Sequence, residues 1–209
     1  MSFKTDVKAI FISDVVAADD NGYSASAQVA NNAALTLGGA LASGGSVTNS
    51  SGRLTEITSG GDDSGISFTV VGTDVNGESM SESITGADSG AATGEKYFKT
   101  ITSITAVGDP AGTVIAGTTA DAADVIFKGR TRVRGVTIVN DAAAGTVDIV
   151  NASGADSITS GTSTFKMGTV ADATAVSGVA IPEDGVLFKN GAYAKFAIGK
   201  CESLTVFRD

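Results

Sequence analysis

The sequence predicts an all-β fold, with two tandem antiparallel β-sandwich or barrel-like modules behind an extended N-terminal arm. Two patterns predict this fold: short runs in which apolar and hydroxyl residues alternate, and glycine-rich turns between those runs. The composition agrees, because it combines 27 glycines with only 2 prolines and is rich in small and β-branched residues that suit twisted strands. We assign the arm to residues 1–22, the first module to residues 23–124 and the second module to residues 125–209.

The clearest single element is a hairpin in residues 66–86. Phe68 and Val70 alternate with hydroxyl residues, as in a half-buried strand. Asn76-Gly77 then gives a strong turn signal, because both residue types tolerate positive φ. Met80 and Ile84 continue the alternation after the turn. A polar bridge over residues 87–95 is expected to lead to the next hairpin.

Two further hairpins are predicted from turn residues. The first joins residues 97–107 to 113–116 through a turn that contains Pro110. Its pattern recurs at residues 133–139 and 144–147, which supports two modules in tandem. The other joins residues 186–188 to 193–198 through Asn190-Gly191.

The arm contains one apolar run that could form a strand, residues 7–16. An isolated strand leaves its backbone unpaired, so we expect this one to pair with the main body or with a neighbouring subunit. It is then either a clasp between subunits or an ordinary first strand of the sandwich. The candidate contact residues are Phe3, Ile10, Phe11 and Ile12.

A basic ridge follows the predicted module boundary. Lys128, Arg130, Arg132 and Arg134 occupy every second position, so a strand would place all four on one face. In a chain of net charge −9 this ridge could dock an acidic partner. The alternative is a solvated strand edge, whose cations discourage edge-to-edge aggregation.

Composition argues against most catalytic chemistry. The chain has 0 histidines, which removes histidine-based triads and most zinc chemistry. The acidic net charge disfavours nucleic-acid binding, which needs a basic surface, and no aromatic residues interleave with the ridge. The single cysteine, Cys201, is expected to be a buried small hydrophobe. We predict no enzyme activity, no metal and no cofactor.

Two acidic features remain as alternatives. The loop at Asp62 and Asp63 could hold calcium, but it lacks the EF-hand spacing, and a polar hairpin loop explains it better. Glycoside hydrolysis would need two facing carboxyl groups, for which Asp62, Asp63, Glu78 and Glu82 are candidates. Glu82 shares strand parity with Met80, so it is expected to be partly buried and paired, for example with an arginine. The chain has 0 Trp, the residue type that often forms sugar platforms.

Three stretches carry a resemblance to a known group of proteins. Residues 61–86 read GDDSGISFTVVGTDVNGESMSESITG, residues 96–117 read KYFKTITSITAVGDPAGTVIAG, and residues 181–207 read IPEDGVLFKNGAYAKFAIGKCESLTVF. These stretches resemble virion structural proteins of tailed bacteriophages, and the resemblance covers roughly residues 30–209.

The resemblance implies a virion protein assembled in the host cytoplasm. Its leading form is a capsid decoration protein that bridges major capsid subunits, as a homo-oligomer for which a trimer is favoured. The alternative is a tail or head–tail connector component, and the third is a polysaccharide-binding or -degrading tail protein. The implied partners are the major capsid protein or neighbouring virion subunits, with no nucleic acid and no membrane.

Overall fold

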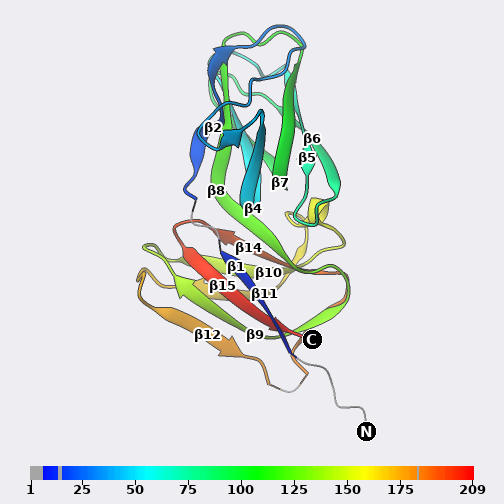
Figure 1. The fold of residues 1–209 in the computed structure, drawn as a ribbon, viewed down its shortest axis with the longest axis vertical. Helices are drawn as coiled ribbons and strands as arrows, with labels where there is room; N and C mark the ends of the chain where they lie inside the picture. Colours follow the sequence, from blue (N-terminus) through cyan, green and yellow to red (C-terminus); the bar gives the residue numbers. More distant parts are fainter. Residues whose placement is uncertain (1–6, 14–15, 183) are drawn as a thin grey trace. The chain divides into compact units, whose positions relative to one another are not determined.

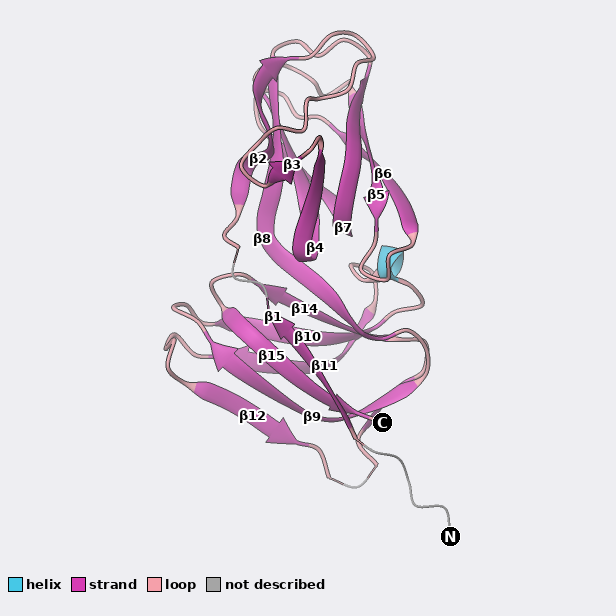
Figure 2. Ribbon diagram, in the orientation of Figure 1, coloured by secondary structure: helices cyan, strands magenta, loops and turns pink. Residues whose placement is uncertain are grey.

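The computed structural model describes residues 7–13, 16–182 and 184–209, and it confirms the all-β prediction (Figure 1). In chain order the strands are β1 (Lys8–Ser13), β2 (Asp19–Gln28), β3 (Ala42–Ser43), β4 (Ser46–Ser59), β5 (Ser67–Thr73), β6 (Ser79–Thr85), β7 (Ala91–Val107), β8 (Thr113–Phe127), β9 (Thr131–Asn140), β10 (Gly145–Asn151), β11 (Thr162–Thr169), β12 (Val176–Ala180), β13 (Val186–Phe188), β14 (Ala192–Ala197) and β15 (Cys201–Arg208). One short 3-10 turn, η1 (Ala155–Ser157), follows β10 (Figure 2).

The chain divides into two compact units. The first unit is residues 18–120, and the second unit is residues 1–17 together with 121–209. The boundary therefore falls between residues 120 and 121, where the predicted one was between 124 and 125. No loop marks this boundary, because β8 continues through it as one strand. Within the predicted arm, the described residues 7–13 and 16–17 group with the second unit and residues 18–22 group with the first.

The second unit is a sandwich of two antiparallel sheets. One sheet has the strand order β1-β15-β9-β12, with β13 also paired to β9, and the other contains β11, β10, β14 and the end of β8. Buried residues of both sheets meet in one hydrophobic core. Ile138, Leu204 and Val206 enter it from the first sheet, and Ile149 and Phe196 enter it from the second. Two sheets that each bury one face against the other are the defining feature of a sandwich.

The first unit is built on one curved sheet with the order β8-β4-β7-β5-β6, to which β2 and β3 are added at β8 and β4. β4 and β7 are long strands, and register shifts interrupt their pairing between Thr48 and Arg53 and between Leu54 and Glu56. Such irregularities bend a strand and increase its twist. The curved sheet encloses a separate core that contains Phe68, Phe98 and other buried side chains.

The predicted hairpin of residues 66–86 is confirmed as β5 and β6. Phe68 pairs with Ile84 and Val70 with Glu82 in an antiparallel register. Gly77 has φ of 78°, and the Asp74 carboxylate accepts the N–H groups of Asn76 at 2.7 Å and Glu78 at 2.9 Å. The turn forms as predicted because the residues that determine it are close together in the sequence.

The other predicted hairpins are wrong. β4 lies between β7 and β8, β9 and β10 belong to different sheets, and so do β13 and β14. At Asn190-Gly191 the turn is tied to the end of β10, since the Asn190 N–H donates to Asn151 Oδ1 at 3.0 Å. At Gly108–Gly112 the Ala111 N–H donates to Asp63 Oδ1 at 2.7 Å, which directs β8 toward β4. Both turns carry the chain away from the preceding strand.

Candidate functional site

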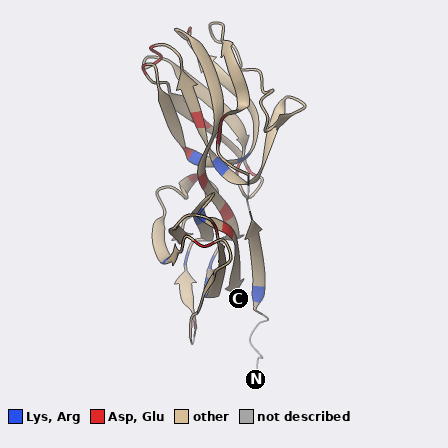
Figure 3. Ribbon diagram, turned by 90° about the vertical axis from the view of Figure 1, so that its left-hand side faces the viewer, with Lys and Arg blue, Asp and Glu red and all other residues tan. Residues whose placement is uncertain are grey.

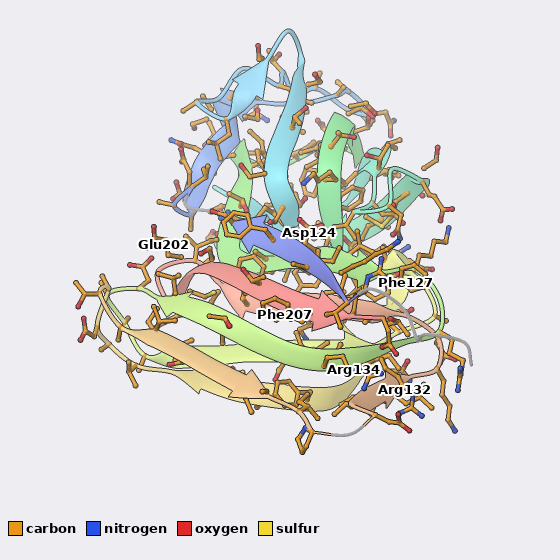
Figure 4. All side chains as sticks on the ribbon, turned by 60° about the horizontal axis from the view of Figure 1, so that its bottom comes forward. Asp124, Phe127, Arg132, Arg134, Glu202 and Phe207 are labelled. Atoms are coloured by element: carbon orange, nitrogen blue, oxygen red, sulfur yellow. The ribbon has the colours of Figure 1, made fainter. Side chains whose placement is uncertain are left out.

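The four cations of the predicted basic ridge do not share one strand face. Lys128 and Arg130 precede β9 and are exposed, whereas Arg132 and Arg134 lie within β9 and are half-buried. Gly129 between the first two has φ of 118°, which breaks the extended alternation that the prediction assumed. Arg132 and Arg134 lie close together at one end of the sheet (Figure 4).

The two strand arginines are used inside the second unit. Arg132 Nη1 donates to the carbonyls of Asp184 at 3.2 Å and Gly185 at 3.4 Å, so it holds the loop before β13. Arg134 Nη2 and Asp209 Oδ2 form an ion pair at 3.0 Å, and their side chains are 22% and 18% exposed. Lys128 and Arg130 are the two exposed cations of the ridge.

The end of the described chain is fixed to the same region. Thr131 Oγ1 donates to the Asp209 carbonyl at 2.7 Å, and the Asp209 N–H donates to the Arg132 carbonyl at 3.2 Å. The Arg208 guanidinium lies 4.1 Å from the centroid of the Phe127 ring, a cation–π contact. These contacts tie the last described residues to the start of β9.

The apolar run of the predicted arm forms the edge strand β1. It pairs with β15, with Ile12 opposite Leu204 and Ile10 opposite Val206. Ile12 is buried in the second core and Ile10 packs against it, so both serve the fold. Phe11 points the other way and is 68% exposed. Phe3 lies outside the described residues.

β1 also leaves one backbone edge open. It ends the strand order of its sheet, so among the described residues only β15 pairs with it. Its one charged position is Lys8 at its start (Figure 3). An edge strand with few charges and exposed apolar side chains is a template for pairing with another chain.

The central part of the sheet face that points away from the core carries no charged side chain, and Arg132 and Arg134, which alternate with the core residue Val133, lie at its end. Strand register and alternation place three residues of each of four strands on it: Ala9, Phe11 and Ser13 of β1; Ser203, Thr205 and Phe207 of β15; Gly135, Thr137 and Val139 of β9; and Val176, Gly178 and Ala180 of β12. We call these twelve residues the outer face. Phe11, Val176 and Phe207 are its exposed large hydrophobic residues, and Phe207 is labelled in Figure 4.

The Asp62–Asp63 loop is held by hydrogen bonds of its own. Asp62 Oδ1 accepts the N–H of Ser64 at 3.1 Å and its hydroxyl at 2.7 Å, and these bonds lower the pKa of Asp62. Asp63 is buried and holds the turn at Ala111. Among the described residues, no group of three or more His, Cys, Asp or Glu side chains could hold a metal ion.

Glu82 lies at a groove in the first unit. Its carboxylate accepts the backbone N–H groups of Glu95 at 2.5 Å and Lys96 at 3.3 Å, so the partners shown are backbone amides and not the arginine that we expected. The groove has a volume of about 340 Å³ and is lined by Glu82–Thr85 of β6 and Ala92–Glu95 of β7. Of the four candidate carboxylates, Glu82 alone is among these lining residues.

Cys201 is buried, as predicted. Burial raises the pKa of its thiol to about 12, and the nearby carboxylates of Asp141 and Glu202 act in the same direction. A thiol that keeps its proton is a poor nucleophile. No helix in the described part of the chain is long and apolar enough to cross a membrane.

The chain matches no protein-family model, and no curated protein is significantly similar to it.

Proposed function

We propose that the chain is a non-enzymatic structural protein of a tailed-phage virion, and specifically a capsid decoration protein that bridges major capsid subunits. The observation that carries this proposal is the outer face beside the open edge of β1. Its twelve residues carry no charge, although the chain has a net charge of −9, and three of them are exposed large hydrophobic residues of the kind that gather at interaction sites. The resemblance of residues 61–86, 96–117 and 181–207 to virion proteins supplies the setting.

The size of the outer face fits a contact that is repeated many times. Strands lie about 4.8 Å apart and rise about 3.4 Å per residue, so four strands over five residues cover roughly 300 Å². A stable interface buries about 800 Å² on each partner. One such contact is therefore weak, and it becomes effective when many subunits bind the same lattice together.

The outer face would bind a neighbouring subunit in two ways. Phe11, Val176 and Phe207 would lose their exposure to water on contact, which is favourable at about 25 cal/mol for each Å² of apolar surface. The open edge of β1 could add backbone hydrogen bonds to a strand of the partner. The partner is either the major capsid protein or a second copy of this chain, within the homo-oligomer that we propose.

A tail or head–tail connector component is the alternative, because the same surface would serve it. Copy number separates the two, and quantitative mass spectrometry of purified virions against the major capsid protein measures it. Hundreds of copies per particle support the decoration protein. A small multiple of three or six, as in a closed ring, supports the tail or connector. Zero copies would overturn the virion proposal.

A further inference from the structure

The strand β12 forms the second open edge of the sheet that carries the outer face. It ends the strand order opposite β1, and among the described residues only β9 pairs with it (Figure 1). Edge strands are commonly protected by charged side chains, prolines or bulges. The five residues of β12 include no charge and no proline, and no register shift interrupts their pairing with β9. This edge is therefore open to pairing with another strand.

Two hydrogen bonds show which backbone groups of β12 point outward. The Asn140 N–H donates to the Ala175 carbonyl at 3.1 Å, and the Ile181 N–H donates to the Arg134 carbonyl at 2.8 Å. These bonds lie just before and just after the ladder between β12 and β9, and bonded and non-bonded pairs alternate between them. The residues whose N–H and carbonyl groups point away from β9 are therefore Val176, Gly178 and Ala180.

A second copy of β12 matches this edge. When the two strands run antiparallel about a two-fold axis at Gly178, Gly178 faces its own copy and Val176 faces Ala180 of the partner subunit. Each pair joins residues whose backbone groups point outward, so each pair can exchange two hydrogen bonds. The strand carries no charge, so no like charges meet within the paired residues.

Gly178 stands at the centre of this edge, where the fold itself does not require glycine. Its φ is not positive, and a Cβ there would meet Thr137 Oγ1 at 3.5 Å, which is an ordinary contact. A glycine inside a strand weakens that strand and often marks the close approach of another backbone. A partner strand across the two-fold axis would supply this approach.

Two of the exposed large hydrophobic residues lie on β12. Val176 belongs to the outer face, whereas Val179 is paired with the buried Val136 on the core side. Val179 remains exposed at the margin of the sheet, where none of the described strands lies beyond it. In the paired arrangement, Ser177 of the partner subunit lies opposite Val179. Pairing would therefore reduce the exposure of both valines.

Pairing through β12 would also enlarge the outer face. A two-fold axis perpendicular to the sheet leaves the outer faces of both copies on the same side. Two faces of roughly 300 Å² each then form one of roughly 600 Å², which approaches the about 800 Å² that a stable interface buries on each partner. The paired edge itself spans only about 17 Å. The copies should thus associate weakly in solution and more firmly where a particle holds them together.

We propose that two copies of the chain pair through β12, antiparallel and about a two-fold axis at Gly178, so that their outer faces form one continuous binding surface. Pairing at a sheet edge takes its affinity from main-chain hydrogen bonds. A two-fold contact is closed, so it yields a dimer and not a filament. The inference rests on the proposed function, because the outer face is the surface that the pairing enlarges.

The direct test is sedimentation equilibrium of the full chain up to millimolar concentration, where we expect monomers and dimers only. Gly178→Lys and Gly178→Glu each place like charges opposite one another at the axis, so each should weaken dimerisation at least about threefold. An equal mixture of the two variants should recover dimers, because lysine then faces glutamate. Since the chain has a net charge of −9, a general effect of charge would strengthen the lysine variant and weaken the glutamate variant.

Matched controls separate the edge from the rest of the surface. Val71→Lys and Val71→Glu, at an exposed site of the first unit, should dimerise like wild type both alone and mixed. Gly178→Pro removes the outward N–H at the axis and should abolish dimers, while Gly178→Ala keeps this N–H and should retain them. The mixture of lysine and glutamate variants tests the pairing if Gly178→Pro does not fold.

Three results would overturn the inference. One is a chain that stays monomeric at millimolar concentration. Another is a trimer, which a two-fold edge contact cannot form. The third is a mixture of Gly178→Lys and Gly178→Glu that associates no better than either variant alone.

Particle binding distinguishes failure of this inference from failure of the proposed function. If dimers are absent and Phe11→Lys still loses binding to particles, the outer face stands as the assembly surface and the pairing through β12 is wrong. If dimers form and Phe11→Lys binds particles normally, the pairing stands and the proposed role of the outer face is wrong.

Discussion

The two units treat their apolar side chains differently. Of the nine exposed large hydrophobic residues among those that the structure describes, two belong to the first unit, Val71 and Val107. Seven belong to the second unit: Val7, Phe11, Val16, Val170, Val176, Val179 and Phe207. Each unit nevertheless has a complete core of its own. The larger number of exposed hydrophobic residues in the second unit is therefore not caused by a missing core.

This difference separates two kinds of contact surface. The second unit presents the uncharged outer face with three exposed large hydrophobic residues, which suits contact with another apolar surface. The first unit has a groove beside Glu82 instead, where the Glu82 carboxylate accepts the backbone N–H groups of Glu95 and Lys96 and so links β6 to β7.

The largest expected effects test the independence of the two cores. Phe68 and Phe188 are both fully buried, one in each core. Phe68→Ala and Phe188→Ala should each lower the free energy of unfolding of their own unit by about 3–5 kcal/mol. Hydrogen exchange should then be faster mainly in residues 18–120 for the first variant and mainly in residues 121–209 for the second. Equal loss of protection in both units would show one cooperative core.

Burial of Cys201 should make stability depend on alkaline pH. Its pKa is about 12 in the folded chain and 9.0 ordinarily, so the folded state keeps the proton to higher pH. The contribution to stability is full below pH 9 and is lost as the pH rises toward 12, by at most about 4 kcal/mol at about 1.36 kcal/mol per pH unit. Denaturant unfolding measures the free energy of unfolding of wild type and of Cys201→Ala between pH 8 and about 11, and the difference between them isolates the contribution of the thiol. If the two free energies change with pH in parallel, the contribution of Cys201 is contradicted.

The ion pair at the end of the sheet should give an intermediate effect. Asp209→Asn removes the negative charge that meets Arg134 and should lower the free energy of unfolding by about 1–2 kcal/mol. Asp172→Asn is the control, because Asp172 bonds only within its own exposed turn. Thermal unfolding that shifts equally in both variants would leave the ion pair without a structural role.

The smallest expected effects concern the two kinds of arginine in the basic ridge. Arg132→Glu should lower stability by about 1 kcal/mol, because it releases the carbonyls of Asp184 and Gly185. Arg130→Glu should leave the melting temperature unchanged and should weaken particle binding most at low salt, where screening is least. Unchanged binding of Arg130→Glu at every salt concentration would instead support the interpretation of the ridge as a solvated strand edge.

Local signals in the sequence were enough for part of the fold. The β5–β6 hairpin was predictable, because Asn76-Gly77 and the alternation beside it act within a few residues. The other turns contain similar residues, yet their strands pair with partners far away along the chain. Asn190-Gly191 illustrates this, since its anchor is Asn151. No turn residue carries that information.

The candidate sites were predictable in part, for the same reason. The apolar run of β1 was visible, but its register against β15 decides that Ile12 is buried and Phe11 exposed. The alternation of cations predicted one strand face, and the turn at Gly129 divided it. Residues 87–95 were interpreted as a polar bridge because they lack apolar alternation, although β7 begins at Ala91 and forms one side of the groove.

The outer face is tested most directly by two neighbouring residues of β1. Phe11→Lys changes the outer face, whereas Ile12→Ala removes a core side chain and should cost about 2–5 kcal/mol of stability. Val71→Lys, at an exposed site of the first unit, controls for added charge. Cosedimentation of each variant with particles stripped of this protein measures binding beside the melting temperature. We predict that Phe11→Lys keeps its melting temperature and loses binding, while Val71→Lys keeps both. Normal binding of Phe11→Lys would contradict the assignment of the outer face as the assembly surface.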